Sequence, residues 1–483
     1  MINYLLMADK RQRRRHRRKR RRKPRGRKAK RALMDPSING GTDIISTMPD
    51  EILHHILSFL PINLVIRTSF FSRRWRHVWC ETPCLNFDCL KATPQDIMQT
   101  LKSYRATKIM SFHLTIPPHV PEPQIDEWME FAVSRNVEKL SLFFHPSRKT
   151  YRFPDSFYRS SSLEQLSLNL YTIPGCTVSW KSLRILTLWS YRLHDDEFMA
   201  NIFSGSPLLE TLKLVGCPVE RLDLSKSPSL RRLEIHPLYR RGRGPAEIVT
   251  PQIHYLRLTF SVEKPPTLVR VSSLAEANLG ISMVSSGFRK DDVLQTMVLK
   301  MLAKLQNVER LTLRTTFLGI LSVAELRGVA FPTLKVKTLT GETMLVKSVV
   351  PGIARLLRNS PGLKKLIAQG TYSGNVEDMD MDRYLDSQGL HPDKCWGSKY
   401  EVLPTTDELN RMLKSCCNDA ASKVVASFME MVLRNGKTLE TLVLGFKDIY
   451  DRGGPMWFKE LLQIPPTLCN NNNVSIVLRR YFT

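Results

Sequence analysis

A six-residue apolar pattern recurs ten times between residues 137 and 444, and it constrains the fold more than any other feature of the chain. Most copies read LxxLxL, in which the closing apolar residues alternate with polar ones. The copies are VEKLSL (from 137), LEQLSL (163), LRILTL (183), LETLKL (209), LRRLEI (230), IHYLRL (253), LAEANL (274), VERLTL (308), LKKLIA (363) and LETLVL (439). Such a pattern predicts a chain built from stacked copies of one structural unit.

The spacing of the copies identifies that unit. Central leucines lie 26, 20, 26, 21 and 23 residues apart at Leu140, Leu166, Leu186, Leu212, Leu233 and Leu256. This is the period of a leucine-rich repeat. One strand cannot bury its apolar face alone, so neighbouring copies stack into a parallel sheet. We therefore expect an α/β fold over residues 137–370, a leucine-rich-repeat solenoid whose parallel β-sheet forms a horseshoe.

The polar residues between the leucines are expected on the concave face of this solenoid. That face is the predicted binding surface, because each leucine is committed to the core. The candidate binding residues on it are Ser167, Thr187, Lys213, Glu234, Arg257 and Thr312.

Most of the positive charge comes from one segment near the N-terminus. Residues 10–31 hold 17 Lys and Arg, and without them the net charge falls from +27 to +10. Like charges repel and nothing apolar can be buried, so residues 1–34 are predicted to be a disordered basic tail. The tail is a nuclear import signal, a nucleic-acid contact through counterion release, or a solvated extension without a specific partner. Residues 35–46, DPSINGGTDIIS, predict a linker.

Membrane, metal and catalytic roles find little support in the sequence. No run of 18 apolar residues occurs, which argues against a membrane span. Nine cysteines at irregular spacings favour a reducing, intracellular compartment over a disulfide framework. No P-loop, GxGxxG, GxSxG, HExxH or CxxC motif occurs, so we predict no catalytic residue, no metal site and no cofactor. The weak candidates are His54, His55, His77, Cys80, Cys84, Cys89, Cys416 and Cys417.

Residues 47–82 predict three short helices, with the sequence MPDEILHHILSFLPINLVIRTSFFSRRWRHVW at 48–79. Thr47 is expected to cap the first helix with Asp50 as a capping-box partner, and Pro61 to end it. Ser72 is expected to cap the third, which carries Trp75 and Trp79 on one face. Three such helices bury little surface by themselves, so they need support from a partner or from the next domain.

This segment resembles an F-box, a motif usually written LPDEIL..ILSFLP......TS.LS.RWR.LW. With the leucine repeats behind it, the chain is similar to the plant F-box/LRR-repeat proteins. Residues 371–483, with CW at 395–396 and GKTLETLVLGF, resemble the FBD-type C-terminal region of that class and would cap the solenoid. Residues 83–136 are expected to be a connecting region between the F-box and the repeats.

The resemblance implies the substrate-recognition subunit of a Skp-adaptor/cullin/F-box ubiquitin ligase. The F-box would bind a Skp-type adaptor, which joins it to a cullin, and the repeats would bind an unidentified protein substrate. We expect roughly half of the motif residues, Trp75 foremost, to hold the helices together instead. Met48 replaces the usual leucine, and Phe70 and Phe71 enlarge a usually aliphatic position. The implied adaptor-binding residues are Met48, Pro49, Ile52, Leu57, Leu60, Pro61, Val65, Thr68, Trp75 and Trp79.

Two other functions are weighed against this one. The alternative is a nuclear leucine-rich-repeat scaffold that associates with nucleic acid through its basic tail. A thiol or metal enzyme is a third hypothesis, for which the sequence names no activating base. We expect no membrane partner, nucleic-acid binding only through the tail, and a location in the nucleus, the cytoplasm or both.

Overall fold

The computed structural model divides the chain into two units, Met1–Pro49 and Asp50–Thr483, which are described separately. In the first unit, helix α2 covers Ile44–Thr47. Thr47 therefore ends a helix, and the expectation that it caps the next one is wrong. The predicted tail 1–34 and most of the predicted linker lie outside the described residues. The structure describes residues 44–88, 92–148, 151–169, 177–189, 196–217, 220–236, 247–261, 265–282, 292–370, 381–392, 403–415, 418–447, 461–465 and 473–481.

The second unit begins with the three predicted helices. They are α3 (Asp50–Ser58), α4 (Ile62–Arg67) and α5 (Trp75–Val78), with 3-10 turns η1 (Thr68–Phe70) and η2 (Trp79–Glu81). Pro61 stands between α3 and α4, where a proline preorganises the start of the next helix. The Trp75 amide donates to Ser72 Oγ at 3.4 Å, but Arg74 occupies the N-cap position of α5, so the expectation that Ser72 caps this helix is wrong. Helices α3 and α4 contact strand β1, which supplies the support that so small a unit needs.

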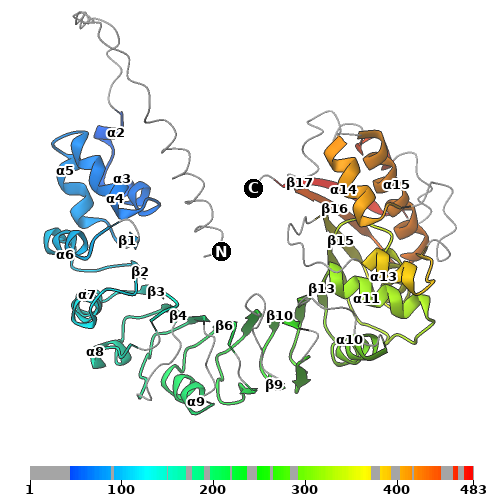
Figure 1. Cartoon of the computed structure of the whole chain (residues 1–483), viewed down its shortest axis with the longest axis horizontal. Helices are drawn as coiled ribbons and strands as arrows, with labels where there is room; N and C mark the ends of the chain where they lie inside the picture. The colour runs from blue at the N-terminus through cyan, green and yellow to red at the C-terminus, as the bar shows by residue number, and fades with distance from the viewer. Residues whose placement is uncertain are drawn as a thin grey trace, which may run out of the picture. The chain divides into compact units, whose positions relative to one another are not determined.

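The main element of the second unit is a parallel sheet of 14 strands (Figure 1). Their order in space is β1-β2-β3-β4-β5-β6-β8-β10-β12-β13-β14-β15-β16-β17. The expected α/β leucine-rich-repeat fold is confirmed. The strands are β1 (Cys84–Asp88), β2 (Ser111–Ile116), β3 (Lys139–Phe144), β4 (Gln165–Asn169), β5 (Ile185–Trp189), β6 (Thr211–Val215), β8 (Arg232–His236), β10 (Tyr255–Ser261), β12 (Glu276–Ser282), β13 (Arg310–Arg314), β14 (Thr338–Glu342), β15 (Lys365–Gly370), β16 (Thr441–Lys447) and β17 (Ser475–Tyr481).

The register of the sheet aligns the leucines of successive repeats. Leu212 pairs with Leu186 on one side and with Leu233 on the other, and Leu233 pairs with Leu256. All four side chains are fully buried or nearly so. Because side chains alternate along a strand, the same register places every intervening polar residue on the opposite face. We call this opposite face the open face of the sheet.

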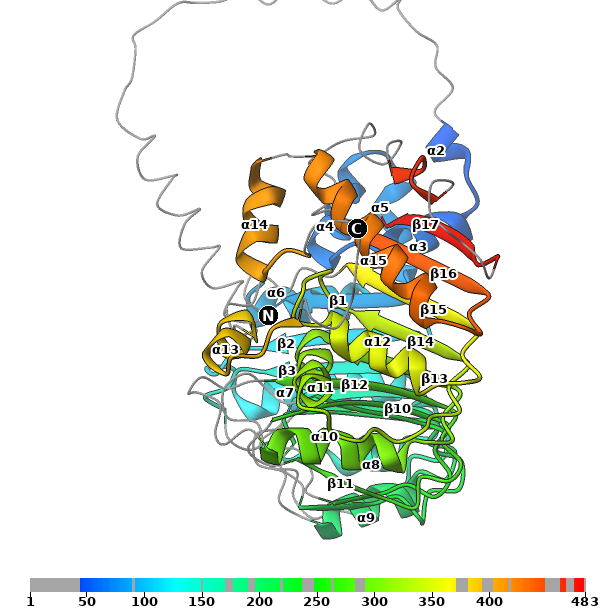
Figure 2. The ribbon, with the colours of Figure 1, turned by 90° about the vertical axis from the view of Figure 1, so that its right-hand side faces the viewer.

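Helices and a smaller sheet cover the leucine side. Figure 1 shows α7, α8, α9 and α10 on one side of the main sheet, and Figure 2 shows α11, α12 and α15 beside strands β13 to β16. Strands β7 (Arg221–Asp223), β9 (Glu247–Val249) and β11 (Thr267–Val269) pair in parallel as a second sheet. The helices are α6 (Pro94–Ser103), α7 (Glu122–Ser134), α8 (Asp155–Tyr158), α9 (Asp196–Gly205), α10 (Asp292–Lys304), α11 (Thr315–Leu326), α12 (Val350–Arg358), α13 (Met381–Ser387), α14 (Thr406–Ser415) and α15 (Asn418–Asn435).

The sheet begins earlier than the leucine pattern indicates. Residues 83–136 are not merely a connection, because β1 and β2 pair with each other and β2 pairs with β3. The sequence of β1, CLNFD, lacks the LxxLxL spacing, and in the β2 segment IMSFHL (109–114) a phenylalanine replaces the central leucine. Strand β14, TLTGE, was also not predicted, because Gly341 stands where the last leucine of the pattern would be.

The C-terminal region continues the same sheet. Strand β16 pairs with β15, and β17 pairs with β16, so the residues after helix α15 extend the sheet. Strand β17 ends the sheet, since it pairs only with β16 in the strand order.

Removing one buried leucine from the stack should destabilise the repeats around it. We expect Leu233→Ala to cost about 2–5 kcal/mol, because the cavity loses contacts to both neighbouring strands. Hydrogen exchange of amides in β6, β8 and β10 should accelerate, as measured by mass spectrometry. Leu208→Ala is the matched control, since its side chain is exposed. Equal acceleration in both variants would contradict the leucine stack.

Candidate interaction surfaces

Four of the predicted adaptor-binding residues are buried inside the three-helix segment. They are Leu57, Val65, Thr68 and Trp75, with exposed fractions of at most 8%. The Thr68 hydroxyl donates to Val65 O at 2.7 Å, which satisfies its polar group within α4. A partner cannot reach these four side chains in this structure. Their predicted contact role is therefore corrected to a structural one, because a unit this small needs them as its core.

The other predicted residues lie nearer the surface. Ile52 is 48% exposed, Pro61 is exposed, and Leu60 and Trp79 are half-buried. Met48 and Pro49 belong to the first unit, where the Met48 amide donates to Ile45 O at 3.3 Å. Residues Ile52, Leu60, Pro61 and Trp79 thus remain available on the second unit.

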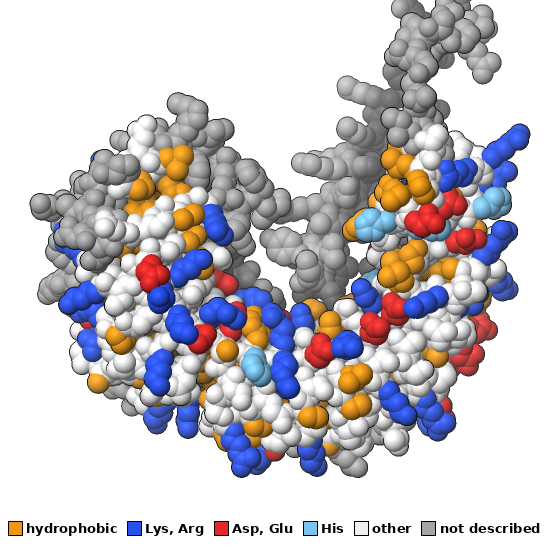
Figure 3. All heavy atoms as spheres, turned by 180° about the vertical axis from the view of Figure 1, so that it is seen from behind, with side chains coloured by type: hydrophobic (Ala, Val, Ile, Leu, Met, Phe, Trp, Pro, Cys, Tyr) orange, Lys and Arg blue, Asp and Glu red, His pale blue; other side chains and the backbone are white. Residues whose placement is uncertain are grey.

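The structure adds apolar residues that the motif did not single out. The larger set of exposed apolar side chains on this segment is Ile52, Ile56, Phe59, Leu64, Phe70 and Phe71, with exposed fractions from 41% to 86%. We call this set the F-box patch. Seven of the twelve large apolar side chains exposed among the described residues lie between Ile45 and Phe71, and Figure 3 shows hydrophobic side chains gathered on this end of the second unit. Exposed apolar surface of this extent marks an interaction site.

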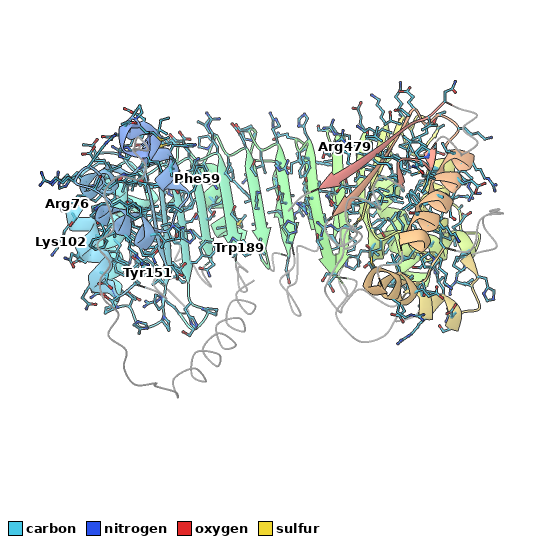
Figure 4. All side chains as sticks on the ribbon, turned by 90° about the horizontal axis from the view of Figure 1, so that it is seen from above. Phe59, Arg76, Lys102, Tyr151, Trp189 and Arg479 are labelled. Carbon is cyan, nitrogen blue, oxygen red and sulfur yellow. The ribbon has the colours of Figure 1, made fainter. Side chains whose placement is uncertain are left out.

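Helical spacing explains one part of the F-box patch. Ile52, Ile56 and Phe59 lie at positions i, i+4 and i+7, so they share one face of α3 and its end. Leu53 and Leu57 occupy the buried face of the same helix. A short helix that is apolar on two faces packs on its own domain with one and leaves the other for a partner. Figure 4 shows Phe59 and Arg76 on different sides of the three helices.

Two polar contacts fix the helices behind the patch. Arg74 Nε donates to Asp50 Oδ1 at 3.1 Å, which joins the start of α3 to the turn before α5. His54 Nε2 lies 3.0 Å from Val78 O and links α3 to the end of α5. These contacts hold α3 in place, so the exposed residues of the patch stand on a preformed support.

The predicted substrate-binding residues form one continuous row across the open face. Pairing runs from Ser167 to Thr187, then to Lys213 and Glu234. It continues from Glu234 to Arg257, and through Asn278 to Thr312. Asn278 is the member that the sequence did not indicate, because its repeat, LAEANL, departs from the consensus. Thr187, Glu234 and Asn278 are each more than nine-tenths buried by their neighbours, so the remaining members offer most of the reachable surface.

Ion pairs organise the centre of this row. Glu234 contacts Arg232 Nε at 2.7 Å and Lys213 Nζ at 3.4 Å. Burial acts to raise the pKa of Glu234, but the Arg232 hydrogen bond and the Lys213 charge outweigh it and hold the pKa below its usual value. Burial, with the positive charge of Arg257 next in importance, lowers the pKa of His236 to about 4. His236 is therefore neutral at neutral pH.

Aromatic side chains occupy the open face nearer the N-terminus. Phe143 lies between His113 and Trp189, with ring centroids 5.4 and 6.2 Å away. Trp189 is 38% exposed and is labelled on its strand in Figure 4. Sequence reasoning missed Phe143 and Trp189 because each stands two residues beyond the central row of its strand. It missed His113, which continues that row through Ser141, because strand β2 was not predicted. The open face therefore carries an aromatic part on β2–β5 and a charged part on β6–β14.

The candidate thiol and metal residues have ordinary surroundings where they are described. Burial raises the pKa of both Cys80 and Cys84, which lowers the reactivity of their thiols. Within the described ranges no three His, Cys, Asp or Glu side chains are placed to hold a metal ion. Cys89, Cys416 and Cys417 lie outside those ranges. None of the described helices is both long and apolar enough to cross a membrane.

These features define a protein that pairs a three-helix F-box with a leucine-rich-repeat solenoid. The F-box domain model matches residues 45–86, and the LRR domain model described as At1g61320/AtMIF1 matches residues 100–320. The chain is 53% identical over 449 residues to the putative F-box/LRR-repeat protein At3g28410 of Arabidopsis thaliana, covering 91% of this chain and 94% of the relative. It is 47% identical over 455 residues to the Arabidopsis F-box/LRR-repeat protein At5g02910, covering 92% and 96%. The chain belongs to the family of F-box/LRR-repeat proteins.

The burial difference along α3 can be tested directly. Leu57→Ala should destabilise the F-box by about 2–4 kcal/mol because its side chain is 1% exposed. Ile56→Ala, the adjacent residue on the exposed face, should change stability by about 0.5 kcal/mol or less. Urea unfolding followed by tryptophan fluorescence measures both. A similar loss of stability in the two variants would show that Ile56 is also part of the core.

Proposed function

We propose that this protein is the substrate-recognition subunit of a Skp-adaptor/cullin/F-box ubiquitin ligase. In this role the F-box patch binds a Skp-type adaptor, and the adaptor joins the protein to a cullin. The open face of the sheet binds the protein substrate. The observation that carries the proposal is an F-box whose exposed apolar side chains are held on a packed helical support, together with its membership of the F-box/LRR-repeat family.

Burial of the patch supplies a sufficient driving force. A large apolar side chain contributes about 1.5–3 kcal/mol when it moves from water into an apolar interface. Ile52, Ile56, Phe59 and Leu64 are each at least 41% exposed, so each retains apolar area to bury against a partner. Part of this energy offsets the entropy lost on association. The remaining free energy of burial is sufficient to stabilise a complex across a small interface.

The proposed subunit does no bond chemistry itself. It forms no covalent intermediate with ubiquitin, and it raises the effective concentration of a substrate lysine near a ubiquitin-conjugating enzyme. Both surfaces belong to the second unit, where α3 and α4 pack on β1 and β1 opens the sheet. A substrate on the sheet and an adaptor on the helices would therefore be linked through one continuous body.

Replacing two exposed residues of the patch should weaken adaptor binding without unfolding the F-box. We expect the Ile52→Glu, Phe59→Glu double variant to bind a Skp-type adaptor about a hundredfold more weakly, because two charged groups would be buried in the interface. Isothermal titration calorimetry with purified adaptor measures the affinity. Leu208→Glu is the matched control, since it adds a charge at an exposed leucine outside the F-box. Unchanged affinity in the double variant would exclude the patch as the docking surface.

We further propose that the basic segment, residues 10–31, directs the protein to the nucleus. Its 17 Lys and Arg are the observation that supports this. Replacing the segment with a Gly/Ser sequence of equal length should move a fluorescent fusion of the full chain from the nucleus to the cytoplasm. Nucleic-acid association predicts instead salt-sensitive retention on DNA or RNA that the same replacement abolishes. An unchanged distribution would contradict the import role.

A further inference from the structure

Arg257 is the one cation on the charged part of the open face that lacks a carboxylate partner among the described residues. Lys213 and Arg232 pair with Glu234, Arg310 pairs with Glu276, and Arg314 pairs with Glu342. Arg257 Nε is shielded from solvent and has no hydrogen-bond partner within the described chain. A shielded donor without an acceptor costs free energy, and the cost is larger for a charged group. This side chain is therefore ready to bind an acceptor from outside.

The side chain of Arg314 extends toward β10, the strand that carries Arg257. Its Cδ would be 2.8 Å from a Cβ atom added at Gly280, and Thr259 Oγ1 would be 3.4 Å from that atom. The side chain of Arg314 thus crosses β12 over Gly280, toward strand β10, which carries Arg257 and Thr259. Its Nε is 3.1 Å from Glu342 Oε2, yet it makes no well-directed hydrogen bond there. Arg314 thus extends toward Thr259, which lies two residues from Arg257 along β10, and both arginines carry a shielded Nε without a well-directed hydrogen bond.

The charge balance of this region favours an anion. On the open face of β6, β8, β10 and β12–β14, five cationic and three acidic side chains leave an excess of two positive charges. Each of the three carboxylates already belongs to an ion pair. His236 adds no positive charge at neutral pH, because burial and the charges of Arg257, Arg314 and Lys213 hold its pKa at about 4. Among the groups that act on this imidazole, only Glu234 raises its pKa.

We propose that Arg257 and Arg314 form an anion-binding subsite on the open face, which takes an oxyanion of the captured protein, a carboxylate or a phosphate. The planar guanidinium fork matches both groups and can bind them through two parallel hydrogen bonds. Arg314 extends over Gly280 toward β10, and neighbouring strands are about 4.8 Å apart, so one oxyanion beside the Arg314 guanidinium is also within reach of Arg257 on β10. Assigning the anion to a protein substrate rests on the proposed function. The anion-binding property itself does not.

Chemical protection of the arginines tests the subsite in the full-length wild-type protein. Phenylglyoxal modifies arginine side chains, and mass spectrometry assigns each modification to a residue. Modified arginines of the basic tail are therefore distinguished from Arg257 and Arg314. With inorganic phosphate or hexaglutamate at about twice its dissociation constant, modification of Arg257 and Arg314 should slow about threefold. Protection by phosphate alone identifies a phosphate site, and protection by hexaglutamate alone identifies a carboxylate site. Arg221 on β7, outside the main sheet, is the internal control and should react at an unchanged rate.

Three variants separate charge from geometry. Arg257→Gln should weaken the protecting anion about tenfold, which corresponds to one lost charged hydrogen bond, whereas Arg221→Gln should not. Arg257→Lys keeps the charge but loses the fork, and should restore binding only in part. Gly280→Ala removes no charge but displaces Arg314, and should release Arg314 from protection. Circular dichroism confirms that each variant is folded.

The outcomes distinguish the subsite from the proposed ligase role. Equal modification rates with and without both anions in the wild-type protein would overturn the subsite, whatever the adaptor binds. Loss of adaptor binding with intact anion protection would overturn the ligase role and leave the subsite in place. If anions protect Arg314 equally well in the Gly280→Ala variant and in the wild type, Arg314 does not depend on its position over Gly280. That result would also contradict the proposed geometry.

Discussion

Stacking of buried leucines from strand to strand is the interaction on which the remaining structure depends. Leu186, Leu212, Leu233 and Leu256 occupy one register position in four neighbouring strands, and the backbone hydrogen bonds of the parallel sheet lock that register. A shift by one residue would expose every leucine of a strand and bury its polar residues. The register therefore fixes the core and the open face together, because the two alternate along the same backbone.

The same sheet supports the F-box. Helices α3 and α4 contact β1, and the buried residues Leu57 of α3, Val65 of α4 and Trp75 of α5 hold the three helices together. The exposed apolar side chains, among them Phe59 just after the end of α3, form a surface on this packed support. An interface built this way loses little conformational entropy on binding, since its residues are already held in place. The solenoid thus carries the open face on its sheet and also supports the helices that bear the F-box patch.

The open face differs along its length in a way that suits recognition of an extended partner. Phe143 and Trp189 offer apolar contact on the N-terminal part, whereas ion pairs around Glu234 and the unpaired Arg257 dominate the centre. Apolar contacts contribute area, and charged groups fix which partner is accepted and in which direction. A family that keeps the leucine core can alter these side chains without disturbing the fold, because none of them belongs to the stack.

The sequence by itself determined the repeat, its strands and the row from Ser167 to Thr312, because leucine spacing and side-chain alternation are local properties. It also located the three F-box helices. Only the tertiary structure decided that β1 and β2 open the sheet, since their pairing energy comes from neighbours and not from a motif. It also decided that Leu57 is core while Ile56 is surface, because which apolar face of α3 is covered depends on α5 and β1. The side chain of Arg314 likewise extends over Gly280 toward β10, the strand of Arg257, which is 57 positions away in the sequence, and this placement depends on strand order.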